Sequence, residues 1–426
     1  MINTFCARLS AFYSIGSHGL WAPLCLKLLS YRTSWIVRLC ALPLMLAWLP
    51  AQAADFTFSG TQAPSGCSGS NGNYTCGVLT LGSKDTLIVA PGVVTTITIN
   101  GNFSTGASSQ INSAGNVLNL VVYGRTDTGT GSLVKANVTG IGTASVITIG
   151  ADSSVVGTLK TDNAAINTGD GSTITGSIFI TSDGAITVGS NATVTGSLNT
   201  VTGAINVGTG SKVGPITSSN AGAVTLGASS VVNGAITTNT GAITTAAGSN
   251  VTGNVITQVG AVTIGGNVGG KINSLDLSTA GAVTVSAGGV ISGAIVTGAG
   301  AVTMEANAQS GGIATKDGAI TLGAGGTVNG SACTGNSGAI TVGANAKVTG
   351  NVITQTAGAI TIGADSTVTG AVIVKGAGAR TIGAGASVGA TENSVLCADV
   401  AVAKAIPPPA SAPKVKSREW RYIFMR

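Results

Sequence analysis

The sequence has little of what most catalytic domains require. Charged residues make up 8% of the 426 residues, aromatic residues 4%, and there is a single histidine, His18. Ser/His/Asp and Cys/His catalysis both depend on a histidine, and His18 lies in a segment that we expect to be removed on export. The acidic residues are scattered and do not recur at one position, so paired-carboxylate hydrolysis is not indicated. We therefore expect no enzyme activity, no cofactor and no metal site.

Residues 1–53 have the features of a signal peptide with an extended n-region. Arg32 and Arg38 precede the apolar run 39–50, and small residues suited to signal peptidase end at Ala53. The run is about a dozen residues, short of the roughly 20 that span a bilayer as a helix. We therefore expect cleavage and export to the periplasm, the outer surface or the medium of a Gram-negative bacterium, with a retained anchor as the alternative.

The positive net charge comes from the two ends of the chain. The formal charge is +6 in total, of which residues 1–53 contribute +4 and residues 404–426 contribute +5. Residues 54–403 hold ten basic and thirteen acidic residues, which gives −3. A basic surface that binds nucleic acid is therefore not expected on the body of the protein.

Four cysteines remain after the expected cleavage, and two of them are close in sequence. Cys67 and Cys76 flank a Gly/Ser/Asn-rich loop, and in an oxidising compartment a disulfide is the natural interpretation. A zinc site is the alternative, but histidines and CxxC spacing are missing. Cys333 and Cys397 are three repeats apart, roughly 14 Å at ~4.8 Å per repeat, beyond the ~7 Å limit for bridging. They are expected to pair only if the chain after residue 390 folds back.

The chain is dominated by a repeat of 18 to 21 residues between about residues 145 and 390. A fixed period of this size is typical of stacked units that cannot bury a core alone. The clearest mark of the repeat is Gly-Ala followed by Ile or Val, with a weakened last copy. The glycines are Gly184, Gly203, Gly222, Gly241, Gly260, Gly281, Gly300, Gly318, Gly338, Gly358 and Gly378.

Each unit has the pattern of short strands joined by tight turns. Ile186 and Val188 alternate with Thr187, which is the period-two pattern of a strand with one buried face. Gly189 ends that strand, and a second apolar strand begins near Val194. Stacking two or three such strands per unit predicts an all-β fold, a right-handed parallel β-helix of triangular cross-section with coils of 18–21 residues.

The sequence divides into four parts. After the signal peptide at 1–53, residues 54–144 predict less regular strands that form an N-terminal cap and include the Cys67–Cys76 loop. Residues 145–390 hold the repeats, and residues 391–426 form a Pro-rich linker and a basic, aromatic tail. That tail is either a solvated or docked end, or a peptide that contacts envelope or surface components. Its interaction candidates are Lys414, Lys416, Arg418, Trp420, Arg421, Tyr422 and Phe424.

One outward position of the repeat is nearly always threonine. β-Branched residues suit strands, and neighbouring hydroxyls can bond along a ladder, so the file has a structural explanation. A flat threonine file on a β-helix also resembles the ice-binding face of some antifreeze proteins, which usually carry two such files. The second candidate file is mixed: Thr195, Asn233, Thr252, Ser292, Asn329, Thr349 and Thr369. The first file is Thr187, Thr225, Thr244, Thr263, Thr284, Thr303, Thr321, Thr341, Thr361 and Thr381, with Asn206 as the exception.

The repeat G-A-[IV]-T-[IVL]-G…V-[TN]-G-x-[IV], as in residues 361–372, resembles that of the bactofilins. This resemblance covers residues 145–390 and implies a right-handed β-helical core that polymerises end to end. Bactofilins are cytoplasmic, have a shorter core and lack a cysteine-bracketed N-terminal unit, so this chain differs from them in three respects.

Three functions are consistent with these features. The first is an exported structural β-solenoid, a scaffold or adhesin-type rod of the envelope or cell surface that associates with itself end to end or sideways. The second is a module that binds ice or a glycan polymer through the threonine file. The third, suggested only by export and the basic tail, is an accessory protein of pilus biogenesis.

Overall fold

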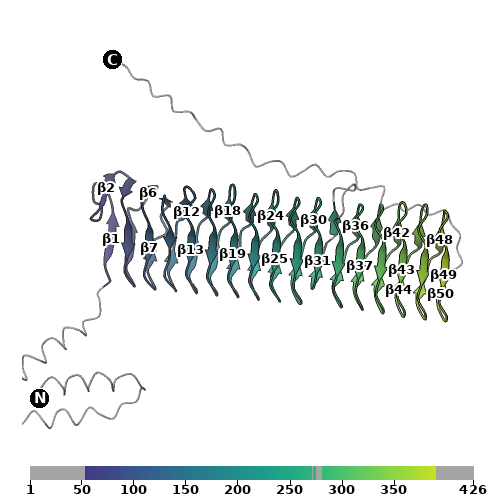
Figure 1. Ribbon diagram of the computed structural model, residues 1–426. Coiled ribbons are helices and arrows are strands. Elements are labelled where there is room, and N and C mark those ends of the chain that lie inside the picture. Colours follow the sequence, from purple (N-terminus) through teal and green to yellow (C-terminus); the bar gives the residue numbers. More distant parts are fainter. Residues whose placement is uncertain (1–52, 271, 275–280, 390–426) are drawn as a thin grey trace, which may run out of the picture. The chain divides into compact units, whose positions relative to one another are not determined.

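The computed structural model describes residues 53–270, 272–274 and 281–389. They form a right-handed parallel β-helix in which every regular coil contributes three short strands, as the repeat predicted (Figure 1). No helix occurs within these residues, and accordingly none there is long and apolar enough to cross a membrane. Residues 1–52 of the expected signal peptide, Cys397 and the tail candidates from Lys414 to Phe424 lie outside the described residues.

The first strand of each coil belongs to sheet I, which has 16 strands in parallel register. This sheet contains the Gly-Ala-Ile/Val repeat mark and therefore the threonine file. Its strands are β4 (Leu79–Leu81), β7 (Phe103–Thr105), β10 (Thr126–Asp127), β13 (Ile147–Ile149), β16 (Ile166–Thr168), β19 (Ile186–Val188), β22 (Ile205–Val207), β25 (Val224–Leu226), β28 (Ile243–Thr245), β31 (Val262–Ile264), β34 (Val283–Val285), β37 (Val302–Met304), β40 (Ile320–Leu322), β43 (Ile340–Val342), β46 (Ile360–Ile362) and β49 (Arg380–Ile382).

The second strand of each coil belongs to sheet II, which has 17 strands, most of them only two residues long. They are β1 (Asp55–Phe58), β5 (Thr86–Val89), β8 (Gln110–Ile111), β11 (Leu133–Val134), β14 (Ser154–Val156), β17 (Thr173–Thr175), β20 (Thr193–Val194), β23 (Lys212–Val213), β26 (Val231–Val232), β29 (Asn250–Val251), β32 (Asn267–Val268), β35 (Val290–Ile291), β38 (Gln309–Ser310), β41 (Thr327–Val328), β44 (Lys347–Val348), β47 (Thr367–Val368) and β50 (Ser387–Val388).

The third strand of each coil belongs to sheet III, which is parallel except for the antiparallel pair β2–β3 at its start. Its strands are β2 (Cys67–Ser70), β3 (Asn73–Cys76), β6 (Thr95–Ile99), β9 (Leu118–Val122), β12 (Asn137–Gly140), β15 (Leu159–Thr161), β18 (Ile178–Ile180), β21 (Leu198–Thr200), β24 (Ile216–Ser218), β27 (Ile236–Thr238), β30 (Val255–Thr257), β33 (Ile272–Ser274), β36 (Ile295–Thr297), β39 (Ile313–Thr315), β42 (Ala332–Thr334), β45 (Val352–Thr354) and β48 (Val372–Val374).

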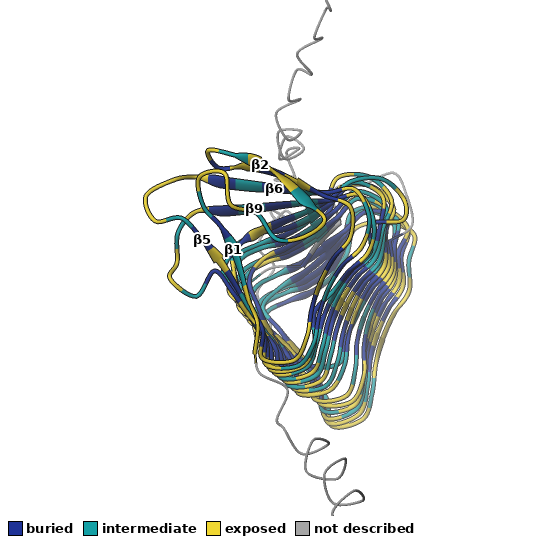
Figure 2. Cartoon of the chain, turned by 90° about the vertical axis from the view of Figure 1, so that its left-hand side faces the viewer, coloured by how far each residue is buried: buried dark blue, intermediate teal, exposed yellow. Residues whose placement is uncertain are grey.

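The core is a narrow aliphatic column enclosed by the three sheets (Figure 2). In one coil, Ile186 and Val188 of sheet I, Val194 of sheet II and Leu198 of sheet III are all buried, whereas Thr187 between the first two is exposed. Each fully buried side chain of this size stabilises the fold by about 1.5–3 kcal/mol relative to exposure. The alternation therefore sets which residues face inward in every coil.

The repeat-mark glycines are required by the closeness of successive coils at the corner between sheets III and I. A Cβ atom at Gly203 would lie 1.6 Å from the carbonyl oxygen of Gly184 in the preceding coil. At Gly222 the corresponding distance to Gly203 is 2.1 Å. No side chain fits there without moving the backbone, so glycine recurs for steric reasons.

A second threonine file, which sequence analysis did not identify, lies inside the same corner. These threonines end the strands of sheet III, and in five of them the buried hydroxyl donates to the carbonyl of the glycine that starts the next coil. Thr238 donates to Gly241 at 2.8 Å, and Thr297 donates to Gly300 at 2.7 Å. Because a buried carbonyl without a partner is costly, these bonds hold the corner closed.

The same corner absorbs some of the differences in coil length. Thr297 bonds a glycine three residues later, whereas Thr334 bonds Gly338, four residues later. The extra residue enlarges the turn, and the sheets on either side keep their register. Coils that differ by a residue therefore stack without displacing any inward side chain.

The first coils continue the same three sheets toward the N-terminus. The strands expected within residues 54–144 include β5, β6 and β9, and these pair in parallel with later strands. The hairpin β2–β3 covers the outer edge of β6 in sheet III, and β1 covers that of β5 in sheet II. Within this region Phe58 and Tyr74 pack edge to face with ring centroids 5.1 Å apart. Aromatic side chains thus fill the first coils, where later coils use aliphatic ones.

Cys67 and Cys76 form the disulfide expected from the sequence, with an S–S distance of 2.01 Å. They are directly opposite each other on β2 and β3. Disulfides of this kind are typical of an oxidising compartment outside the cytoplasm.

We expect replacement of both cysteines by serine to loosen the first coils only. Losing a disulfide that closes a loop of this size costs about 2–3 kcal/mol, and in a stacked array the loss stays near the altered unit. Hydrogen exchange should accelerate in β1–β6 and remain unchanged beyond β20. The exposed hairpin substitution Ser68→Ala is the control and should alter neither region. Acceleration along the whole stack would contradict this expectation.

Candidate binding face

The threonine file runs along the middle of sheet I in unbroken register. Thr225 pairs with Thr244 and Thr361 pairs with Thr381, and every step between them joins two threonines. Nine consecutive coils therefore present a threonine at one position, over about 38 Å at ~4.8 Å per strand. Asn206 separates this run from Thr187.

All ten threonines predicted to face outward lie on this surface. All but Thr381 sit between two buried residues of their own strand, as Thr341 does between Ile340 and Val342, whereas the neighbours of Thr381 in the last coil are exposed. Thr263, Thr284 and Thr303 are half-buried, and the other seven are exposed. The exposed threonines are Thr187, Thr225, Thr244, Thr321, Thr341, Thr361 and Thr381.

A file of alanines lies beside the threonines, two residues earlier in each coil. Its register is fixed by backbone bonds such as Ile186 N–H to the carbonyl of Ala204, and Ile340 N–H to that of Ala359. Sequence analysis noted Gly-Ala only as a repeat mark and did not assign the alanine to this surface. The members are Ala165, Ala185, Ala204, Ala223, Ala242, Ala261, Ala282, Ala301, Ala319, Ala339, Ala359 and Ala379.

Together the two files make a surface with a two-dimensional repeat, which we call the Thr/Ala face. Neighbouring strands are ~4.8 Å apart, and residues two apart along a strand are about 6.6 Å apart. The backbone donors and acceptors of the strands bond within the sheet, so methyl groups and threonine hydroxyls are what the surface offers. Neither file holds a charged residue between Thr148 and Thr381. Such a surface suits an uncharged, regular ligand.

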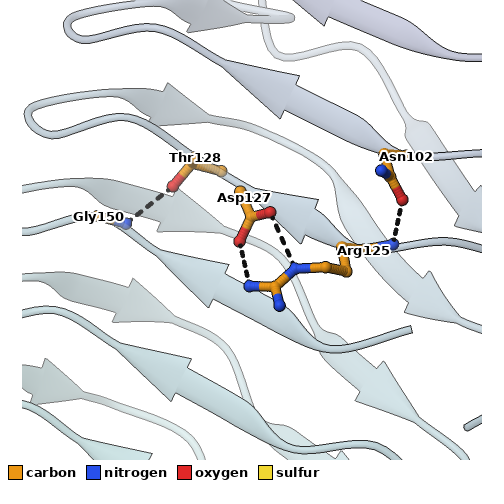
Figure 3. Close-up of polar contacts among 5 residues, drawn as sticks. All are labelled: Asn102, Arg125, Asp127, Thr128 and Gly150. Carbon is orange, nitrogen blue, oxygen red and sulfur yellow. Dashed lines mark hydrogen bonds and ion pairs between the residues drawn. The ribbon is translucent and has the colours of Figure 1, made fainter. Parts of the chain in front are cut away.

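A charged pair marks the N-terminal border of the Thr/Ala face (Figure 3). Arg125 occupies the alanine position and Asp127 the threonine position of their coil, and their side chains are 3.2 Å apart. Asp127, through its hydrogen bond and its charge, raises the pKa of the Arg125 guanidinium. The side-chain oxygen of Asn102 accepts a 2.9 Å bond from the Arg125 backbone N–H, which joins this coil to the one before.

The mixed file that was considered as a second threonine rank is not on sheet I. Thr195 follows β20, and Thr252 follows β29, so the file lies at the corner between sheets II and III. The true neighbour of the threonine file is the alanine file. Alternation within a strand identifies outward residues, but it does not show which of three outward faces they share.

Other predicted site residues are separated from this face. Cys333 lies on sheet III and is disulfide-bonded. Since Cys67 and Cys76 pair with each other, its partner lies outside the described residues, as does the candidate Cys397. No group of three or more metal-ligating side chains occurs among residues 53–270, 272–274 and 281–389.

Comparisons with known proteins identify no family. No protein-family profile matches the chain, and no curated protein sequence matches it. Among solved structures, an ice-binding protein from an Antarctic bacterium, Flavobacteriaceae, is similar at 18% sequence identity over 84% of this chain and 85% of that chain. Its TM-score is 0.21, and a likeness at this level carries no argument about function.

Proposed function

We propose that this protein is an exported structural β-solenoid, a scaffold or adhesin-type rod of the bacterial envelope or cell surface. The observation that supports this most directly is the uninterrupted parallel pairing of coils from Asp55 to Val388. Sixteen strands of sheet I span about 72 Å at ~4.8 Å each. The proposal assigns the protein no catalytic activity.

The solenoid is well suited to separating two attachment points. Each coil contacts only the coils on either side of it. The core side chains serve packing alone, so a ligand has no need to reach them. The Cys67–Cys76 disulfide in the first coils is consistent with a function outside the cytoplasm. The proposed partners are further copies of the protein, joined end to end as in bactofilins or sideways, and envelope components that contact the basic tail.

Fractionation of the native cells, together with electron microscopy of the purified mature chain, tests this function. We expect the protein in the periplasmic, outer-surface or secreted fraction, as thin particles that associate at high concentration or bind envelope fragments. A protein that stays strictly monomeric and binds neither cells nor envelope fractions would refute the proposal.

The Thr/Ala face favours a second candidate function, adsorption to ice or to a regular glycan polymer. Nine threonines in unbroken register and a parallel alanine file give a flat, uncharged lattice along one sheet. Because both files repeat with the strand spacing, many weak contacts can form at once with a ligand of matching period.

We expect Thr263→Tyr combined with Thr341→Tyr to abolish this binding while leaving the fold intact. Both side chains point outward, so the larger rings interrupt contact without disturbing the core. The measurements are thermal hysteresis with ice shaping, and co-sedimentation with chitin and cellulose. The control is Thr237→Tyr on sheet III, which should retain full activity. Equal activity in both variants would rule out this face.

A further inference from the structure

The outward residues of sheet III become more deeply buried part-way along the stack. From β15 to β30 the outward residue is half-buried, whether it is polar, as at Asn199 and Thr237, or apolar, as at Phe179 and Ile256. From β36 to β45 the outward residue is apolar and buried, whereas in the last strand of the sheet, β48, Ile373 is again half-buried. The buried members are Val296, Ala314, Cys333 and Ile353, with 7%, 2%, 3% and 1% of their surface exposed.

These residues face away from the core, so the coils themselves cannot bury them. In β39 the inward residues Ile313 and Thr315 are buried, and the outward Ala314 between them is buried as well. In β27 the equivalent outward residue, Thr237, is half-buried. A sheet that is buried on both sides requires a second layer, and that layer must cover β39, β42 and β45.

The disulfide of Cys333 indicates which part of the chain supplies the layer. The described cysteines Cys67 and Cys76 are bonded to each other, and Cys333 is itself disulfide-bonded. Its partner therefore lies outside the described residues. Apart from the cysteines of the expected signal peptide, the sequence leaves Cys397.

The repeat also ends where the chain would enter sheet III once more. Val388 pairs with Val368, so a further regular strand would bring residue 392 to the position that Val372 holds one coil earlier. That residue is Glu392, and a carboxylate in the aliphatic column would cost several kcal/mol. The chain must therefore leave the stack close to the end of sheet III.

The distance is within reach of the chain. Eight residues connect Gly389 to Cys397, and extended chain covers up to ~3.3 Å per residue, about 26 Å in total. Cys333 lies three strand spacings before the position of the next coil, about 14 Å. Residues 395–403 read V-L-C-A-D-V-A-V-A, with Asp399 as the single charge, which suits packing on an apolar strip.

We infer that residues 394–403 fold back over the outer side of sheet III, and that a Cys333–Cys397 disulfide fastens them there. The segment covers the strip formed by Ala314, Cys333 and Ile353. The Pro-rich linker and the basic tail then leave from the side of the solenoid at sheet III. The Thr/Ala face of sheet I stays uncovered, so a partner of the tail and a ligand of that face do not compete.

Peptide mapping of the full mature chain without reduction tests the covalent part. Trypsin should release Asp317–Lys347 joined to Thr381–Lys404 as one species, which separates on reduction and is absent from Cys397→Ser. Recovery of both peptides with alkylatable thiols, or of Cys333 joined to any other cysteine, would overturn the inference.

Hydrogen exchange in the same chain tests the docking. Ile353→Asp places a charge in the strip without touching the core, and we expect exchange of residues 394–403 to accelerate at least tenfold. Thr237→Asp, outward on the same sheet but away from the strip, should leave that exchange unchanged. If Ile353→Asp does not fold, Ala314→Asp replaces it. Unaltered exchange in a folded strip variant would show that the segment is tethered but not docked, contrary to the inference. Neither measurement depends on what the solenoid binds.

Discussion

Replacing Ile320 with aspartate should unfold the coils around β40, whereas the same change at Thr321 should leave them intact. Ile320 is 1% exposed, and its neighbour Thr321 is exposed on the Thr/Ala face. The first variant loses an aliphatic contact worth about 2–5 kcal/mol and buries an unpaired charge. We therefore expect a loss of at least about 4 kcal/mol for Ile320→Asp, and less than about 0.5 kcal/mol for Thr321→Asp.

Urea denaturation followed by circular dichroism, with hydrogen exchange resolved by coil, measures both variants. The two substitutions are one residue apart and introduce the same side chain, so the net charge of the two variants is the same. Similar losses in the two variants would mean that the alternation of inward and outward residues in sheet I is wrong.

The second large effect is expected from Gly338→Val. A Cβ atom at Gly338 would lie 2.2 Å from the carbonyl oxygen of Gly318, so the two coils must separate at the corner. Overpacking of this kind costs about 1–3 kcal/mol. The valine also weakens the 2.9 Å hydrogen bond that the Thr334 hydroxyl donates to the Gly338 carbonyl. We expect a total loss of about 3 kcal/mol.

Ala339→Val is the matched control for this glycine. Ala339 is the next residue and is exposed, so a larger side chain there meets solvent and stability should stay within about 0.5 kcal/mol. Hydrogen exchange in the glycine variant should accelerate in β40–β46 and remain slow in β1–β9, because each coil contacts only its neighbours. Equal stability of both variants would show that the corner is looser than its geometry indicates.

The sequence was sufficient to predict most of the fold. Alternation of Ile186, Thr187 and Val188 defined the strand and its two sides, and the regular spacing of the glycines defined the stack. The same regularity placed the threonines in one file, and the structure puts them in register. These features follow from local pattern and from a fixed period, both of which are visible in one dimension.

The features that the sequence did not predict depend on how the three sheets meet at the corners. The buried hydroxyl of Thr238 looks like an exposed strand residue until the corner brings Gly241 within 2.8 Å of it. The alanine file required knowledge that Ala339 and Thr341 share sheet I. Burial of Ala314 and Ile353 needs a layer from elsewhere in the chain, which no periodicity within the repeat could indicate.

The turn that accommodates an extra residue between sheets III and I has a consequence for how the protein can evolve. Unequal recombination within the gene would add or remove whole units of about 19 residues, and that turn would accept a small difference in unit length. Homologous genes should therefore encode solenoids with different numbers of coils, while the composition of each face is retained. Related proteins with different numbers of coils would then differ in reach but keep the same surface chemistry.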